Sequence, residues 1–325
     1  MSEHTVHNAA QIERRGFIAW GLALAVLALA PCIGLYPVFM MKALCFAIFA
    51  CAFNLLLGYT GLLSFGHAAY LGMAAYVTGW LIRSAGWSTE LGILAGTAVA
   101  AGLGLVVGAI AIRRQGIYFA MITLAMAQML YFVCLQAPFT GGEDGLQGVP
   151  RGKLFGLIPL ADDRVLYYVV LAVFVAVFLF IVRVVHSPFG QVLKAIRENE
   201  PRAISLGYDA DRYKLMAFVL STALAGLAGA LKTLVLGFAT LSDAHWSLSG
   251  EVVLMTLLGG MGTFAGPVLG AITVIGLQDF LADRAGSWVN VIIGATFVVC
   301  VIAFRRGFIG ELIAAQQRFH GRRKG

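Results

Sequence analysis

The polar side chains of residues 58–76 (GYTGLLSFGHAAYLGMAAY) are the first group that could do chemistry. Thr60, Ser64 and His67 place hydrogen-bonding groups inside an otherwise apolar run, which Gly61 and Gly66 interrupt. Non-helical backbone at membrane depth is tolerated where it lines a cavity or is sheltered by protein. These five residues are therefore candidates for lining a solute pathway. If the half helix that follows exposes its start, that end would favour an anionic group such as a carboxylate.

His67 has two interpretations. Its imidazole could contact a solute, or it could bond a neighbouring backbone carbonyl and pin two helices together. Other polar residues of the apolar runs are expected to form interhelical hydrogen bonds or to lie at interfaces: Asn54, Gln128, Glu251, Gln278 and Asn290.

The second polar group is KAIRENEPRAISLGYD, residues 194–209, where charges of both signs interrupt a largely apolar sequence. Asn199 suits a helix N-cap, Pro201 is permitted in a first turn, and Gly207 can end the helix in a left-handed conformation. The pattern predicts a short helix from Glu200 to Leu206. Such a helix cannot persist alone, so it lies either on its own bundle or against a cytoplasmic partner.

Catalytic and cofactor motifs are not found in the sequence. It contains no phosphate-binding GxxxxGK[ST], no HExxH, no nucleophile triad and no paired acidic site, so we expect no catalytic residue, no metal site and no cofactor bound by this chain. The five cysteines lie in apolar surroundings without a CxxC pair, which is typical of small buried hydrophobic residues.

The composition indicates an integral membrane protein. The 325 residues are 60% hydrophobic and 12% charged, with a mean hydropathy of +0.87, whereas soluble domains carry about a quarter charged residues. The net charge of +7 comes from Lys and Arg beside the ends of apolar runs, as membrane orientation requires, and this distribution excludes a nucleic-acid partner. The lengths of the runs predict helices rather than barrel strands.

Counting apolar runs gives an all-α, polytopic bundle of about ten transmembrane helices. The expected spans cover 17–35, 38–57, 62–82, 91–112, 117–136, 165–185, 214–237, 250–259, 267–282 and 288–304. The short span 250–259 leaves a re-entrant or broken segment open. At the N-terminus, a retained first helix competes with a twin-arginine or lipoprotein signal.

The positive-inside rule then assigns the sides of a single transmembrane domain, 17–304. It places the segment 1–16, the loop 186–213 and the basic tail 305–325 in the cytoplasm, with the tail against lipid headgroups, and the loop 137–164 outside. That outer loop could cap the cavity, receive a partner or be simply solvated.

Small residues recur every four positions in residues 91–110, forming a stripe on which another helix can pack closely. The stripe consists of Gly92, Gly96, Ala100, Gly104 and Gly108, and a later span repeats the pattern at Thr222, Gly226 and Ala230.

Four stretches resemble, in the same order, the LivM/LivH family, the permeases of branched-chain amino-acid ABC importers. They are GYTGLLSFGHAAYLGMAAY, TGGEDGLQGVP, AIRENEPRAISLGYDADRYKLMAFVLSTALAGLAGAL and LLGGMGTFAGPVLGA, and the resemblance covers about residues 39–312, closer to LivM than to LivH. It implies that the short cytoplasmic helix is a coupling helix seated on an ATPase. The general permease loop pattern, EAA followed by three residues and Gly, is only partly met, because Pro201 and Arg202 depart from it. The coupling residues so implied are Arg197, Glu200, Arg202, Ala203, Ile204, Leu206, Gly207 and Asp209.

The resemblance further implies a subunit of the bacterial cytoplasmic (inner) membrane that is not itself an enzyme. Its partners would be a LivH-like permease, two ATPase subunits that bind ATP and an extracytoplasmic binding protein. A permease for urea or short amides and a stand-alone secondary transporter are the alternatives.

Overall fold

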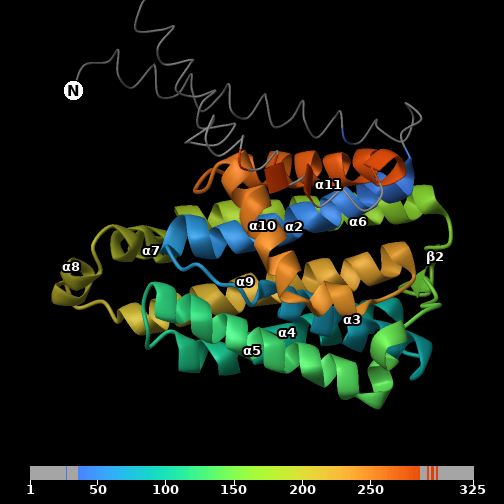
Figure 1. Cartoon of the computed structure of the whole chain (residues 1–325), viewed down its shortest axis with the longest axis horizontal. Coiled ribbons are helices and arrows are strands. Elements are labelled where there is room, and N and C mark those ends of the chain that lie inside the picture. The colour runs from blue at the N-terminus through green and yellow to red at the C-terminus, as the bar shows by residue number, and fades with distance from the viewer. Residues whose placement is uncertain (1–26, 28–35, 286–290, 293, 296–297, 299–325) are drawn as a thin grey trace, which may run out of the picture.

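The described part of the chain is a bundle of helices (Figure 1). The computed structural model describes residues 36–285 together with positions 27, 291–292, 294–295 and 298. The longer helices are α2 (Pro37–Thr60), α3 (His67–Arg83), α4 (Thr89–Ala111), α5 (Ile117–Gln136), α6 (Asp163–His186), α7 (Pro188–Glu198), α9 (Ala210–Leu236), α10 (Trp246–Gly259) and α11 (Gly266–Ala285). Short elements are α8 (Glu200–Ser205), the 3₁₀ turns η2 (Pro138–Thr140), η3 (Gly142–Asp144) and η4 (Leu241–Ala244), and the two-residue strands β1 (Lys153–Leu154) and β2 (Ile158–Pro159).

Five helices within the described residues are long and apolar enough to cross a membrane, namely α2, α4, α5, α6 and α9. Their bounds follow the expected spans within a few residues. The span expected over 62–82 instead begins as a helix at His67, because residues 61–66 are not helical. The spans 17–35 and 288–304 fall outside the described residues except for isolated positions, so the count of about ten stays a prediction.

The loops of the described residues lie on two ends of the bundle. Arg197 of α7 reaches Gly58 near the end of α2, and Gly262 of the α10–α11 turn contacts the same turn of α2. Gly116, between α4 and α5, lines a hollow together with Gly61. The outer-loop strands lie at the opposite end of the bundle (Figure 1). The loop 186–213 and the turns after α4 and α10 therefore share one end, whereas the assignment of that end to the cytoplasm remains a prediction.

The small-residue stripe of α4 packs as predicted. All five of its members are buried, and the helices that meet them are α3 and α9. A Cβ on Gly104 would overlap the side chain of Thr222, and one on Gly226 would overlap Ala100. The two stripes found in the sequence thus pack against each other, and the close approach rests on glycine at both helices.

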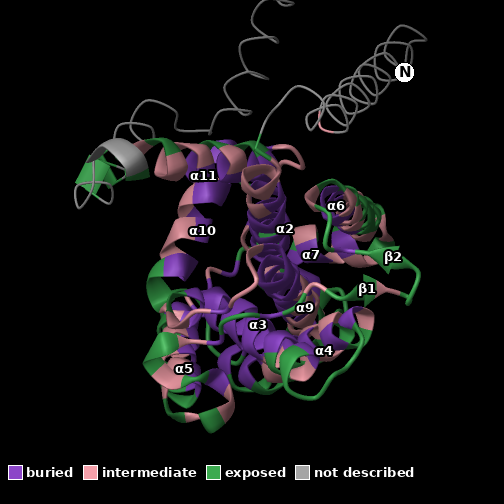
Figure 2. Ribbon diagram, turned by 90° about the vertical axis from the view of Figure 1, so that its right-hand side faces the viewer, coloured by how far each residue is buried: buried purple, intermediate pink, exposed green. Residues whose placement is uncertain are grey.

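The core surrounds α2, which is buried over most of its length between α6, α9, α10 and α11 (Figure 2). Cys45 and Cys51 of α2 and Cys134 of α5 are buried free thiols, which confirms the expectation for these three cysteines. Cys32 and Cys300 lie outside the described residues.

The loop 137–164 is folded onto the bundle rather than simply solvated. Leu146 pairs with Ala239 in an isolated antiparallel bridge, and Leu146, Val149 and Leu160 are buried. The strand pair β1–β2 closes this loop with Leu154 opposite Ile158, a small β element that the all-α prediction did not include.

Candidate functional site

The non-helical segment 61–66 joins the end of α2 to the start of α3 and is largely enclosed by protein. In Figure 1 the trace that follows α2 turns back toward the middle of the bundle, where α3 begins. Three hydroxyls accept the N–H groups at this helix start: Thr123 from Phe65 (3.3 Å), Ser64 from Gly66 (3.2 Å) and Ser249 from Ala68 (2.9 Å). These bonds satisfy backbone donors that a helix start leaves without partners. In this conformation the start of α3 is closed rather than open to an anion.

The imidazole of His67 is fully buried at this helix start. Its Nε2 lies 2.9 Å from Oγ of Ser221, and that hydroxyl donates its only proton to the carbonyl of Ala52. Nε2–H must therefore be the donor to Ser221. The rings of Phe53, Tyr70 and Phe218 meet the imidazole edge-on, and Nδ1 has no hydrogen-bond partner. His67 joins α3 to α9 and, through Ser221, to α2.

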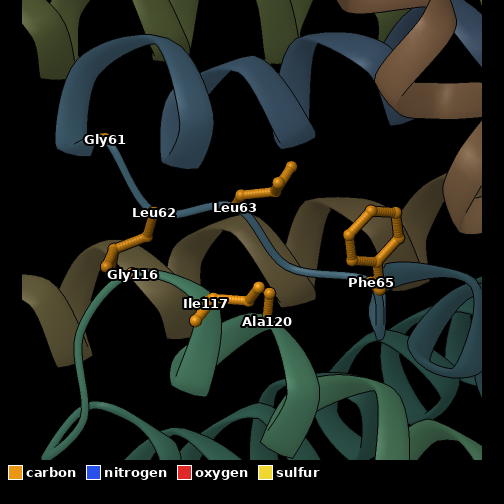
Figure 3. Close-up of a pocket in the computed structure, with 7 residues that line it drawn as sticks. All are labelled: Gly61, Leu62, Leu63, Phe65, Gly116, Ile117 and Ala120. Carbon is orange, nitrogen blue, oxygen red and sulfur yellow. The ribbon is translucent and has the colours of Figure 1, made fainter.

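A hollow of about 390 Å³ opens beside the segment 61–66 (Figure 3). Apolar side chains and two glycines line it: Gly61, Leu62, Leu63, Phe65, Gly116, Ile117 and Ala120. Of the five pathway candidates, only Gly61 is part of this lining. Thr60, Ser64, Gly66 and His67 are buried behind it. The structure thus gathers the five candidates around the non-helical segment 61–66 but separates the polar members from the hollow.

The short helix predicted within residues 194–209 is present as α8, Glu200–Ser205, and ends one residue earlier than expected. The Asn199 side chain accepts the N–H of Arg202 at 3.1 Å, which confirms the predicted cap. At the other end Gly207 has φ +90°, and its N–H donates to the Ile204 carbonyl at 2.9 Å. This left-handed glycine ends the helix, as the sequence predicts.

α8 projects from the end of the bundle and touches it on one side only (Figure 1). Ala203 is buried against Ile196 and Ala210. Ile204 is 54% exposed and Leu206 70% exposed. The predicted coupling residues are therefore divided: Ala203 packs inward, Glu200 and Arg197 make polar contacts with the bundle, and the others form a mixed apolar and charged outward surface that includes the exposed Arg202.

Two polar contacts tie this region to the bundle. Glu200 of α8 forms an ion pair with Lys214 of α9. Arg197 at the end of α7 donates to the Gly58 carbonyl, three residues before the non-helical segment that begins at Gly61. Asp209 caps α9 by accepting the N–H of Arg212 at 3.2 Å.

Asn54 adds the glycine-rich turn after α10 to this junction. Its Nδ2 donates to the Thr263 carbonyl and its Oδ1 accepts the N–H of Gly262, both at 2.9 Å. A Cβ on Gly58 would overlap the Asn54 amide, so glycine is required at this position. The end of α2 is thus held from one side by α7 and from another by the α10–α11 turn. The expectation of interhelical bonds is confirmed for Asn54 and for Gln278, which donates to Glu251 at 3.0 Å.

A buried ion pair was missed from the sequence. Lys232 of α9 pairs with Asp243 of η4, and their side chains are only 9% and 7% exposed. Asp243 also accepts the N–H of Thr240 in a capping box. The sequence did carry a signal for this pair, because charged residues within apolar runs are rare in membranes and are usually paired. Among the described residues, no three His, Cys, Asp or Glu side chains gather as a metal would require.

Comparison with known proteins gives one family and several relatives. The family described as branched-chain amino acid transport system / permease component matches residues 38–301. The high-affinity branched-chain amino acid transport system permease protein LivM of Escherichia coli is 29% identical over 261 residues, which cover 73% of this chain and 61% of that protein. The autoinducer 2 import system permease protein LsrC of Salmonella choleraesuis is 30% identical over 195 residues, 57% of this chain and 53% of its own. The aligned region thus spans about 61% of the LivM relative's length. No solved structure matches significantly.

Proposed function

Because the chain belongs to the family of branched-chain amino acid transport permease components, we propose that it is a membrane-embedded permease subunit of an ATP-driven importer. Its partners in this proposal are a second permease, two ATPase subunits and an extracytoplasmic binding protein. The observation that carries the proposal is α8, a short helix that projects from one end of the bundle with apolar side chains turned to solvent.

A docked partner explains the surface of α8. An isolated helix of six residues is unstable, and here Ala203 is the one fully buried residue of α8. Ile204 and Leu206 remain exposed between charged residues such as Arg202. Apolar anchors with a polar rim are what a protein partner buries. We assign this surface, from Arg197 to Asp209, to the ATPase.

Movement of α8 would reach the bundle by two routes. The Glu200–Lys214 ion pair leads into α9, and Arg197 leads through Gly58 to the segment 61–66. The bidentate bond of Asn54 joins the α10–α11 turn to the second route. Nucleotide can drive such a change only if the ATPases bind one arrangement of these elements more tightly than the other.

The hollow beside Gly61 supports an amino acid with an aliphatic side chain. Its lining is apolar, including Leu62, Phe65 and Ile117. Leucine or valine has an aliphatic side chain to bury against this lining, whereas urea has none. The polar groups behind the lining, including Ser64 and His67, would join the pathway only if the segment 61–66 rearranges during alternating access.

The experiment is uptake into proteoliposomes that contain this chain with its four companion proteins. We expect leucine accumulation that requires ATP and that excess valine suppresses. Urea and autoinducer 2 serve as competitors. Suppression by either of them but not by valine would end the assignment of the solute, and accumulation without ATP or ATPases would end the assignment to an importer.

The coupling surface has its own test in the double variant Arg202→Glu with Leu206→Asp. Both side chains are exposed, so the bundle should stay folded while ATP hydrolysis no longer drives uptake. Arg114→Glu reverses an exposed charge at the same end of the bundle, between α4 and α5, and should keep normal uptake. Unchanged uptake by the double variant would show that α8 is not the coupling element.

A further inference from the structure

The β1–β2 hairpin carries an apolar tip that no contact within the described residues covers. Phe155 is 72% exposed, Leu157 83% and Ile158 42%. Three neighbouring apolar side chains so exposed mark a surface for a partner rather than ordinary scatter.

The turn at this tip is built at a conformational cost. The N–H of Leu157 donates to the Leu154 carbonyl at 3.1 Å, and the two residues between them have positive φ, +50° at Phe155 and +70° at Gly156. Asn or Gly is favoured where φ is positive, and a bulky side chain there is an outlier. Phe155 is the only such non-glycine residue in the part of the chain that the structure describes. Strain of this kind points to a function for the displayed ring.

The base of the hairpin is held firmly. The Arg151 guanidinium donates to the Val235 carbonyl at 3.0 Å and pairs with Asp163, while Thr89 donates to the Arg151 carbonyl at 3.1 Å. Leu160 donates its N–H to Gly152 at 3.2 Å and is buried. The tip is therefore presented in a fixed position relative to α4, α6 and α9.

The hairpin lies at the rim of the bundle and not over its middle. The view onto this end shows it beside α6 and α4 (Figure 2). Leu91 and Leu94, in the first turns of α4, are 51% and 65% exposed, and Trp87 just before α4 is 47% exposed. Exposed apolar side chains thus occur at this end of the bundle both on the hairpin tip and on the first turns of α4, and tryptophan at such a level is typical of the membrane interface.

The charges near the tip suit lipid headgroups. Lys153 is exposed at the start of β1, and no acidic residue occurs between Asp144 and Asp162. From the position, the apolar side chains and this charge, we infer that the hairpin is a lipid anchor: Phe155, Leu157 and Ile158 enter the boundary between headgroups and acyl chains on the face opposite α8, and Lys153 lies among the phosphates. The anchor requires only a membrane-embedded bundle and does not rest on the proposed transport function.

The test places a tryptophan at the tip. The full chain carrying Phe155→Trp is assembled into nanodiscs of phosphatidylcholine and phosphatidylglycerol, with or without bromine on the acyl chains. The parent chain, with its own five tryptophans, supplies the background. We expect the emission added by the new tryptophan to be blue-shifted, lost in brominated lipid and resistant to iodide in water. Leu157→Trp is a second reporter if the first variant folds poorly.

Two outcomes would overturn the anchor. In one, iodide quenches the added emission and brominated lipid does not. In the other, brominated lipid has no effect, and the reporter becomes protected from iodide only after the binding protein or the second permease is added. The tip would then bind a protein instead of lipid. Adding Leu157→Asp and Ile158→Asp to Phe155→Trp should abolish the bromine effect, and its persistence would also contradict the anchor.

Discussion

The two ends of α9 carry the same kind of ion pair in different settings. Lys214 near its start pairs with Glu200 of α8, and Lys232 near its end pairs with Asp243 of η4. The two lysines are 18 residues apart, which is about five helical turns, so they lie on one face about 27 Å apart. The single helix α9 therefore connects the projecting helix α8 to η4 inside the bundle.

The difference lies in what else holds the acidic partner. Asp243 is fixed by the capping box with Thr240, while its neighbour Ala244 packs on Gly72 of α3. Glu200 lies on a helix of six residues that touches the bundle on one side. An ion pair in the first setting belongs to a rigid structure, whereas in the second it joins two parts that can move relative to each other.

The largest effect is expected from Lys232→Met. It leaves the Asp243 carboxylate buried without its partner, and breaking a buried pair in this way costs about 3–5 kcal/mol. We expect a strong loss of thermal stability and of yield in detergent, measured by fluorescence-detected size-exclusion after heating.

Removing both charges supplies the control for that variant. Lys232→Met with Asp243→Asn leaves no unpaired charge and should recover most of the stability, because buried pairs contribute little compared with neutral side chains of similar volume. A double variant as unstable as the single one would mean that the pair itself, rather than the orphaned charge, determines the stability.

The middle of α9 gives the next effect, through the stripe of α4. A Cβ at Gly104 would overlap Thr222, whereas one at Gly102 would meet nothing within 4 Å. Gly104→Ala should therefore destabilise the bundle by about 1–3 kcal/mol through overpacking. Gly102→Ala, in the same helix, should be neutral or slightly stabilising because alanine is the better helix former. Equal thermal stabilities for the two variants would show that α4 and α9 do not pack as closely as described.

These contacts also show how much the sequence could predict. The helix bounds follow from apolar length, the cap at Asn199 and the stop at Gly207 follow from local turn chemistry, and the stripe follows from a spacing of four. Each depends on residues close together in the chain. The packing of the α4 stripe against the α9 stripe is a long-range contact that depends on the tertiary fold, so the sequence could not predict it.

The parts that were missed all involve chain reversals. Lys232 and Asp243 are close only because residues 237–245 fold back against α3 and α5, which hydropathy does not encode. Glycines at positions 61 and 66 indicate the interruption of the apolar run, but the apolar leucines between them do not reveal that α3 begins only at His67. Separation of the polar candidates from the hollow likewise depends on side-chain directions that spacing alone does not fix.

The start of α9 should give a smaller change in stability and a larger one in coupling. Lys214→Met removes a buried charge but leaves Glu200 on a projecting helix, where the carboxylate can turn to water, so the loss in stability should stay below the loss of about 3–5 kcal/mol expected for Lys232→Met. If α9 receives the motion of α8, more ATP should be hydrolysed per solute taken up by reconstituted vesicles. Lys214→Arg keeps the charge and should restore the ratio. An unchanged ratio in Lys214→Met would leave Arg197 as the remaining route.

The smallest effect is expected two residues away, at Arg212. Its ion pair with Asp209 is made by side chains that are 83% and 51% exposed, and such pairs are screened and contribute less than about 1 kcal/mol. Arg212→Gln removes the charge but keeps the backbone N–H that Asp209 caps, so thermal stability and the ATP ratio should both stay near those of the parent. Asp209→Ala removes the cap as well and should cost about 1 kcal/mol. If Arg212→Gln instead matched Lys214→Met in both measurements, the response would reflect any charge lost at the start of α9, and the ion pair with Glu200 would have no special role in joining α8 to the bundle.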